Sequence, residues 1–177
     1  MKNIFKVLII TAGIVLSLNV NSFAIVDGAI WGGYGFNGEV EDASDIDVTG
    51  INYGIKAHYN TSLVPLIELG LGAYYQRTTV TFDYTGGDDD YDRESAGIDL
   101  NLILGTPIVH PYLRGTFGLW DKFEDDTENY KAWGAGIGVE LTVFPFIRIF
   151  GEYMHESTEH DIEITMDSVN VGIKADI

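Results

Sequence analysis

Apolar and polar residues alternate along most of the chain after residue 24. In the segment 49–59, Ile51 and Ile55 share one face, whereas Asn52 and Lys56 share the other. A period of two is the spacing of a β-strand, because successive side chains of a strand point to opposite faces. The same alternation recurs in the segments 26–36, 49–59, 66–76, 96–104, 112–120, 133–143, 147–154 and 168–177. We therefore predict an all-β protein, an eight-stranded antiparallel up-and-down transmembrane β-barrel, for which an even number of strands is needed.

The connections between these segments alternate in length. Short connections are expected around 61–63, 107–111 and 144–146, and long ones at 37–48, around 86–90, at 121–130 and at 156–163. Alternate connections of an up-and-down barrel lie on the same rim. Short periplasmic turns and long external loops are typical of outer-membrane barrels, so the long connections are predicted to face the outside.

Negative charge is concentrated in the long connections. The chain has 27 Asp and Glu against 10 Lys and Arg, a net charge of −17, and the short connections hold no acid. The acids predicted for the outer rim are Glu39, Glu41, Asp42, Asp45, Asp47, Asp83, Asp88, Asp89, Asp90, Asp92, Glu94, Asp121, Glu124, Asp125, Asp126, Glu128, Glu156, Glu159, Asp161 and Glu163. This balance excludes nucleic acid as a partner, because phosphate binding needs clustered cations. Weak binding of divalent cations at the acidic loops is an open alternative to a merely solvated surface.

The first 24 residues have the pattern of a secretory signal peptide. Lys2 and Lys6 precede an apolar run at 7–18, and Ser22-Phe23-Ala24 places small residues where a signal peptidase reads them. The alternative is a membrane anchor, but the run is shorter than the ~20 residues that a spanning helix needs. We predict a signal peptide at 1–24 and an outer-membrane barrel domain at 25–177.

The polar face of the predicted strands is expected to line the barrel interior. It carries four cations and four acids, a neutral set within an acidic chain, which indicates structural ion pairs in a confined lumen. These residues are Lys56, Glu68, Asp99, Arg114, Glu140, Arg148, Glu152 and Lys174. Tight turns centred near 62 and 144 would place Lys56 across from Glu68 and Glu140 across from Arg148. The alternative is a set of solvated surface pairs, which contribute little to stability.

Glycines and aromatic residues support this orientation. Glycines on the polar face leave room for longer inward side chains, which predicts a filled interior and not an open pore, since eight strands enclose only enough space for side chains. These glycines are Gly70, Gly72, Gly134, Gly136 and Gly138. The apolar face carries aromatics near the outer rim, typical of a membrane-interface girdle. They are Tyr34, Phe36, Tyr75, Trp133 and Tyr153.

The chain resembles the small outer-membrane barrels of the OmpA-transmembrane-domain and OmpX type. The resemblance rests on the eight alternating segments, on Val64-Pro65-Leu66, on His110-Pro111-Tyr112-Leu113-Arg114 and Phe144-Pro145-Phe146-Ile147-Arg148, and on the alternation at 169–175. It implies an integral protein of a Gram-negative-type outer membrane, with membrane lipid as a partner. One departure is the terminal Ile177, where that family usually has an aromatic residue read by the assembly machinery.

Few residues suggest catalysis or metal binding. The chain has no cysteine, and Asp88, Asp90 and Asp92 resemble the start of a calcium loop that Arg93 interrupts where glycine is required. His58 is expected in the lumen and His110 in a tight turn.

His155 and Ser157 should both face lipid, and such a pair resembles the outer-membrane lipid A deacylases. The sequence departs from that family at Thr158-Glu159, where the family has Asn-Ala, and it places no acid beside the histidine. The alternative for this pair is polar residues where a strand leaves the membrane.

We predict a non-enzymatic surface barrel that contributes to envelope integrity and contacts external partners or cations through its loops. No catalytic residue, cofactor or metal ligand is assigned. The alternatives are an enzyme acting on lipid A or phospholipid through His155 and Ser157, and a barrel that passes a small apolar ligand laterally into the membrane.

Overall fold

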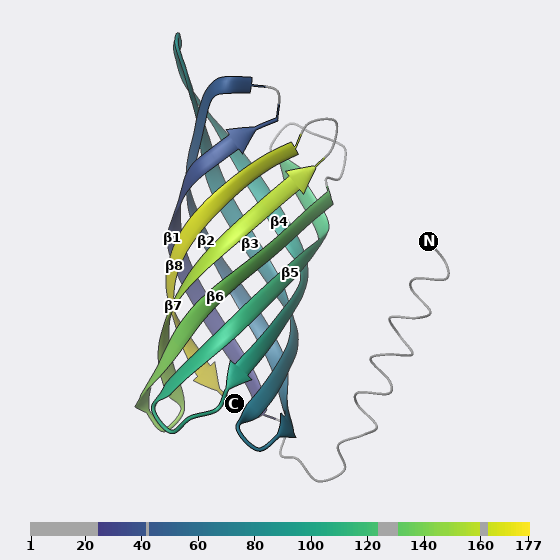
Figure 1. Ribbon diagram of the computed structural model, residues 1–177, viewed down its shortest axis with the longest axis vertical. Helices are drawn as coiled ribbons and strands as arrows, with labels where there is room; N and C mark the ends of the chain where they lie inside the picture. Colours follow the sequence, from purple (N-terminus) through teal and green to yellow (C-terminus); the bar gives the residue numbers. More distant parts are fainter. Residues whose placement is uncertain (1–24, 42, 124–130, 160–162) are drawn as a thin grey trace, which may run out of the picture.

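The computed structural model describes residues 25–41, 43–123, 131–159 and 163–177. They form eight strands and are shown in Figure 1: β1 (Ile25–Val40), β2 (Ala43–Val64), β3 (Ile67–Tyr84), β4 (Gly87–Leu104), β5 (Val109–Phe123), β6 (Lys131–Phe144), β7 (Ile147–Glu159) and β8 (Glu163–Asp176). No helix within these ranges is long and apolar enough to cross a membrane. The predicted signal peptide lies outside the described residues and stays a prediction.

The strands form one closed ring. Each strand pairs with the next in antiparallel fashion, and β1 closes the ring by pairing with β8, from Asp27 opposite Asp176 to Val40 opposite Ile164. The prediction of an eight-stranded antiparallel up-and-down barrel is therefore confirmed. Closure leaves no free sheet edge along the membrane-spanning part, where unpaired backbone groups would be costly in lipid.

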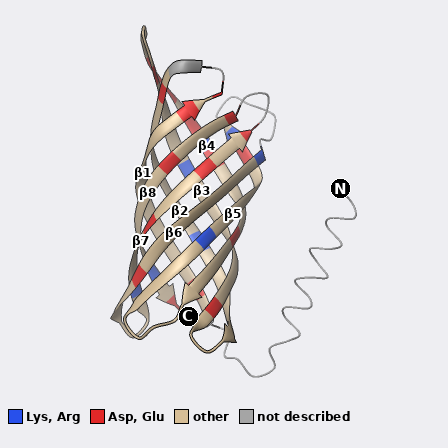
Figure 2. Cartoon of the chain, viewed as in Figure 1, with Lys and Arg blue, Asp and Glu red and all other residues tan. Residues whose placement is uncertain are grey.

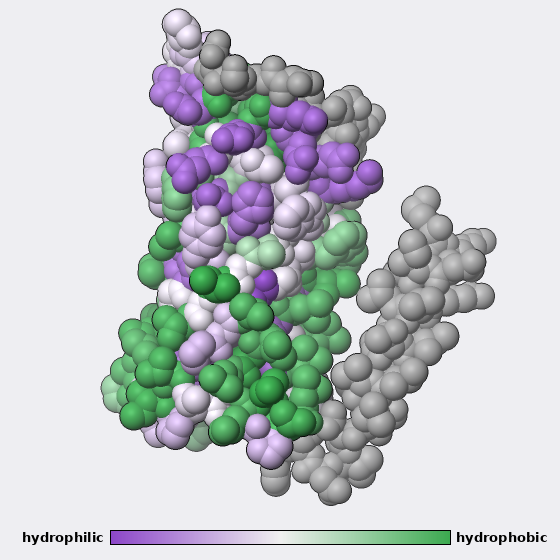
Figure 3. Space-filling model, viewed as in Figure 1, coloured by the Kyte–Doolittle hydropathy of each residue, from purple (hydrophilic) through white to green (hydrophobic). Residues whose placement is uncertain are grey.

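The exterior and the interior differ sharply in polarity. Along β2, Ile51 is 65% exposed on the outside, whereas its neighbour Asn52 is 1% exposed on the inside. On the face shown in Figure 3, apolar side chains cover most of the lower half and polar side chains cover most of the upper half, and exposed large apolar residues occur on all eight strands. A contiguous apolar band around a charged interior is the arrangement of a membrane-spanning barrel and not of a soluble one.

Several connections are shorter than the sequence predicted, because the strands extend above the apolar band. The β3–β4 connection is only Thr85 and Gly86, and the segment 88–92 belongs to β4. Outside the membrane both faces of a strand are solvated, so apolar alternation ends while backbone pairing continues. Cross-strand bonds replace the apolar contacts there: Thr81 Oγ1 donates to Asp90 at 2.6 Å, and Thr79 Oγ1 donates to Asp92 at 2.8 Å.

Two predicted turn positions are wrong. The β2–β3 turn lies at Pro65 and Leu66, not near residue 62, and Leu66 has the left-handed φ of 73°. His110 belongs to β5 and not to a turn; its side chain is buried, and Nε2 lies 2.9 Å from the hydroxyl of Thr142 on β6. Proline at 65 ends the ladder of β2, because it has no backbone N–H to donate.

Candidate functional site

A continuous series of charged and hydrogen-bonding groups lines the lower interior of the barrel. It begins with Asp176 at the end of the barrel that carries the short turns, and it proceeds through neighbouring strands and across the lumen, each member in contact with the next. The order is Asp176, Arg148, Glu140, Lys174, Asp27, His58, Asp99, Arg114, Glu152 and Lys56. We call these ten residues the interior charge series. Acidic residues alternate with basic ones along it. Figure 2 shows that both basic and acidic residues occur on the strands of the lower half of the barrel.

The partner predicted for Lys56 is wrong. Lys56 Nζ lies 3.1 Å from Glu152 Oε2, across the lumen. The β2–β3 register pairs Lys56 with Tyr74 and not with Glu68. Aromatic rings surround the ammonium group, the nearest being Phe150 at 4.5 Å from its centroid. Glu68 lies lower, beside Gly105. The misplaced turn shifted the expected register and so separated a pair that looked opposite.

The predicted contact between Glu140 and Arg148 is present at 3.0 Å. Its geometry is diagonal and not directly across the strands, because Glu140 pairs with Phe150 and Arg148 pairs with Thr142. Arg148 also contacts Asp176, at 2.8 Å. The long side chain of Arg148 spans the two-residue offset between the strands, so the ion pair with Glu140 does not require the predicted register.

Asp27, His58 and Asp176 belong to the series but were not included among the predicted ion pairs. The Nδ1 atom of His58 lies 2.9 Å from Asp27, and its Nε2 atom lies 3.3 Å from Asp99. The series holds five Asp or Glu and four Lys or Arg, so His58 occupies the position of a fifth cation. Closure of β1 onto β8 brings Asp27 to Lys174, at 3.2 Å.

A β-bulge changes which face the upper part of β5 presents. The β4–β5 register shifts between Ala96 and Gly97, which pair with Trp120 and Gly118, so Leu119 is the extra residue. Trp120 therefore faces outward instead of inward, and Asp121 faces inward instead of lying in a loop. Its carboxylate receives hydrogen bonds from Arg93, the shortest at 2.7 Å. Arg93 is likewise an interior residue and not part of the predicted loop.

The interior is filled by aromatic rings lying over glycines. A Cβ atom on Gly138 would lie 2.3 Å from the ring of Tyr112, and one on Gly172 would lie 2.5 Å from the ring of Phe150. Lys56, Asp99, Arg114, Glu152 and Lys174 are each at most 6% exposed. The prediction of inward-facing glycines that make room for larger groups agrees with these contacts. The charge series and the rings together close the lumen at this level.

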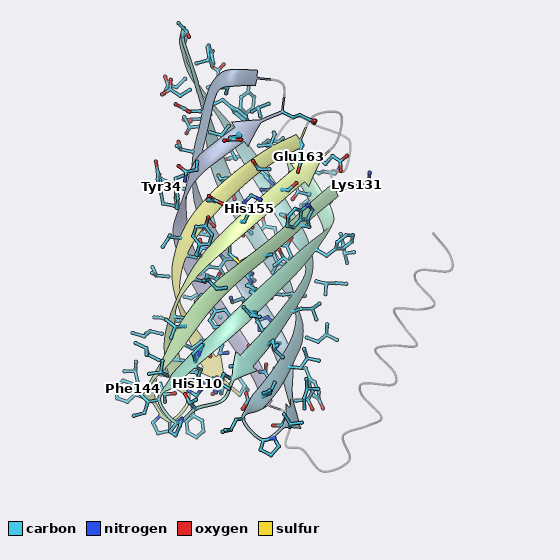
Figure 4. All side chains as sticks on the ribbon, viewed as in Figure 1. Tyr34, His110, Lys131, Phe144, His155 and Glu163 are labelled. Carbon is cyan, nitrogen blue, oxygen red and sulfur yellow. The ribbon has the colours of Figure 1, made fainter. Side chains whose placement is uncertain are left out.

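A second polar cluster lies on the outside of the barrel, at the upper edge of the apolar band. His155 Nδ1 lies 2.8 Å from Asp167 Oδ1, and Asp167 also accepts hydrogen bonds from Tyr153 and Asn37. The indole ring of Trp133 is 5.8 Å from the His155 ring. We call these five residues the interface cluster; His155 is labelled in Figure 4. The acid that the sequence did not place beside His155 is therefore Asp167, which β8 brings directly opposite it.

Ser157 differs from the sequence expectation. It shares the outward face with His155, but only 1% of it is exposed, and its hydroxyl donates to Glu163 at 2.6 Å. His155 has 45% of its side chain exposed. Ser157 is thus not oriented toward His155 as a nucleophile paired with a base would be.

The acids above the membrane are held in pairs with hydroxyls and with Arg77. Hydrogen bonds from the Arg77 guanidinium and the Thr79 hydroxyl lower the pKa of the Asp92 carboxyl. Tyr84 donates to Asp89 at 2.6 Å, and this contact raises the pKa of the phenol. Within the described part of the chain no group of three or more His, Asp or Glu is arranged to hold a metal ion.

Comparison with solved structures identifies the fold. The crystal structure of Neisserial surface protein A (NspA) is similar to the chain with a TM-score of 0.62 and 16% identity, over 88% of this chain and 98% of that chain. The chain has the fold of the small outer-membrane β-barrels. The outer membrane protein OprG from Pseudomonas aeruginosa (TM-score 0.48, 11% identity, 87% and 97% covered) and the Yersinia pestis outer membrane protein Ail (0.45, 17%, 85% and 99%) are also similar. No protein-family model and no curated protein matches the chain.

The fold and the apolar band together place this small outer-membrane barrel within the outer membrane as an integral protein. Its short turns at 65–66, 105–108 and 145–146 contain no acid, whereas the opposite end carries the acidic extensions of β3 and β4. In outer-membrane barrels the longer, more polar end faces outward. That the acidic end faces the exterior of the cell therefore stays a prediction.

Proposed function

We propose that the barrel is a non-enzymatic surface protein that contributes to envelope integrity through contacts made by its outer rim. The observation that carries this proposal is the closed interior. The interior charge series is nearly inaccessible, and Arg114 is bonded to both Asp99 and Glu152 at its centre. Such a lumen is suited to stabilising the barrel and not to passing solutes, so function is assigned to the outer surfaces.

The β3–β4 hairpin of the outer rim is suited to contact because strand pairing and side-chain hydrogen bonds hold it together. The β3–β4 hairpin extends above the membrane with Asp83, Asp88, Asp89 and Asp90 near its tip, held by cross-strand bonds such as Tyr84 to Asp89. An acidic, strand-built projection would attract cationic partners, or divalent cations shared with anionic lipid headgroups, and would repel anionic surfaces. This surface supports a contact role better than a catalytic one.

Shortening the hairpin tests the proposal. Deletion of residues 80–83 and 88–91 removes four residues from each strand, which preserves the pairing of Tyr84 with Gly87 and the inward or outward direction of each remaining side chain. We expect the shortened barrel to insert normally and to show the shifted gel mobility of an unheated barrel. It should fail to restore detergent resistance to cells lacking the protein, whereas the full-length chain restores it. Full restoration by the shortened barrel would contradict a contact role for this rim.

A second candidate function is hydrolysis of a lipid ester at the interface cluster. The observation that favours it is the hydrogen bond of Asp167 with His155 Nδ1, which orients the ring and leaves Nε2 to accept a proton from an attacking water. The attacking oxygen would form the new bond to the acyl carbon, and the released alcohol would take the proton from His155.

Mass spectrometry of lipid A and phospholipid incubated with the refolded barrel tests this candidate. Hydrolysis predicts released fatty acid from the wild-type barrel and at least a hundredfold less from His155→Gln, on the order of the loss typical for a general base. Phe117→Leu, an exterior change in another strand, serves as the control. Equal amounts of fatty acid from the wild type and a no-protein sample would exclude the reaction.

A further inference from the structure

Two apolar grooves adjoin each other on the membrane-facing surface of β6, β7 and β8. The first, of about 880 Å³, extends around the barrel from β3 to β8 and includes Ile137, Tyr153 and Val169 along one border. The second, of about 580 Å³, includes Leu141, Ile149 and Ile173 along its far border. Both are lined by Val139, Gly151 and Val171, which the strand register places in one row. The two grooves therefore lie on either side of a single low ridge.

Glycine makes this ridge low. Gly151 and Gly32 both point outward and both flank Val171 in the register, one on β7 and the other on β1. A Cβ atom on Gly151 would have no contact closer than 4.0 Å, so open space lies above it. Larger side chains at these two positions would separate and partly fill the grooves.

The first groove ends beneath the interface cluster. Tyr153 and Val169 form its upper border, and the next outward residues on the same strands are His155 and Asp167. Trp133 covers one side of His155, and Asp167 is already satisfied by its three donors. The exposed His155 ring is thus a polar group positioned at the membrane surface, at the point where an acyl chain in the groove would reach its headgroup.

Charges of both signs lie two outward-facing rows farther out, beyond the row of Trp133, Ser157 and Thr165. Lys131, Glu159 and Glu163 occupy one outward-facing row across β6, β7 and β8. Lys131 and Glu159 are exposed, and Figure 4 shows Lys131 and Glu163 above His155. A headgroup held here would meet a lysine and an imidazole, which suit a phosphate, and two carboxylates, which suit an amine.

We propose that this surface binds one zwitterionic aminophospholipid of the outer leaflet. Its two acyl chains lie in the two grooves on either side of Gly151. Its phosphate lies near His155 and Lys131, and its amine lies near Glu159 and Glu163. Two chains match two adjacent grooves, and the mixed charges match a zwitterion better than an anionic lipid, because carboxylates near an uncompensated phosphate are repulsive. The assignment goes beyond the proposed rim contacts and does not depend on them.

Retention of lipid by the purified barrel tests the assignment. Barrels are reconstituted with equal amounts of phosphatidylethanolamine and phosphatidylglycerol, extracted into detergent and washed. Native mass spectrometry then identifies and counts the lipids that remain bound. We expect about one bound phosphatidylethanolamine per wild-type barrel. Gly151→Leu should retain it roughly tenfold less, equivalent to losing the burial of about two methylene groups. Val171→Trp, which fills the same ridge, should have the same effect.

Gly28→Leu is the matched control. Gly28 is also an outward glycine, and a Cβ atom on it would meet nothing within 4 Å, but it lies outside both grooves. It should retain lipid like the wild type, and all variants should keep the gel shift of a folded barrel. If Gly28→Leu and Gly151→Leu retained equal amounts of phosphatidylethanolamine, the bound lipid would be ordinary annular lipid, and the proposed site would be overturned. Equal retention of phosphatidylglycerol and phosphatidylethanolamine would overturn the headgroup assignment.

Discussion

Replacing Arg114 with methionine should destabilise the barrel by about 3–5 kcal/mol, the cost typical of removing one partner from a buried ion pair. Arg114 is 4% exposed and donates to Asp99 at 2.7 Å and to Glu152. Without the guanidinium, both carboxylates remain in a confined space without their main counter-charge. Urea unfolding of the refolded barrel, followed by tryptophan fluorescence, measures the change.

Arg77 is the matched control for Arg114. It also pairs with an aspartate, Asp92, but its side chain is 39% exposed above the apolar band. Surface pairs of this kind contribute little, so Arg77→Met should leave the urea midpoint nearly unchanged. Combining Arg114→Met with Asp99→Asn and Glu152→Gln should recover part of the loss. Equal effects of the two arginine substitutions would show that the interior is hydrated enough to screen the charges.

Replacing Gly138 with valine should also destabilise the barrel, by about 1–3 kcal/mol or more, because the interior has no space for the side chain. A Cβ atom there would lie 2.3 Å from the Tyr112 ring. The ring cannot move away without stretching the hydrogen bond from its hydroxyl to Glu152, now 2.7 Å. The steric cost and the weakened hydrogen bond should therefore add.

Gly28→Val provides the comparison for Gly138→Val. The exterior position has no neighbour within 4 Å of an added Cβ atom, and valine favours the strand conformation over glycine. We expect an unchanged or slightly raised urea midpoint, measured as for the arginine variants. If Gly138→Val unfolded at the same urea concentration as Gly28→Val, the tight packing of ring on glycine would be disproved.

Side-chain alternation alone determined the fold class and the direction of most side chains. Ile51 and Asn52 point outward and inward as a period of two requires, and the neutral charge of the polar face indicated a closed interior. Alternation also identified most members of the interior charge series, including Lys56, Arg114 and Lys174, because burial in a lumen selects residues on one face of every strand.

The sequence was least informative where no apolar face is needed. Above the membrane, β3 and β4 continue as a paired hairpin, although their Asp-rich segment has the composition of a loop. Pairing is maintained there by hydroxyl–carboxylate bonds such as Thr81 to Asp90, and composition alone does not reveal such bonds. The bulge at Leu119 is similarly hidden, because one extra residue reverses the direction of Asp121 without an apolar signal.

Only the tertiary structure decided which residues meet. Alternation assigns a face to a residue, but it does not fix the register between strands or the stagger with which the ring closes. Closure brings Lys56 of β2 to Glu152 of β7, 96 residues away, and brings Asp27 of β1 to Lys174 of β8. The same register sets Asp167 opposite His155 and aligns Gly151 with Val171, which creates the interface cluster and the grooves. These contacts depend on the positions of several strands at once, and no local pattern in one strand contains that information.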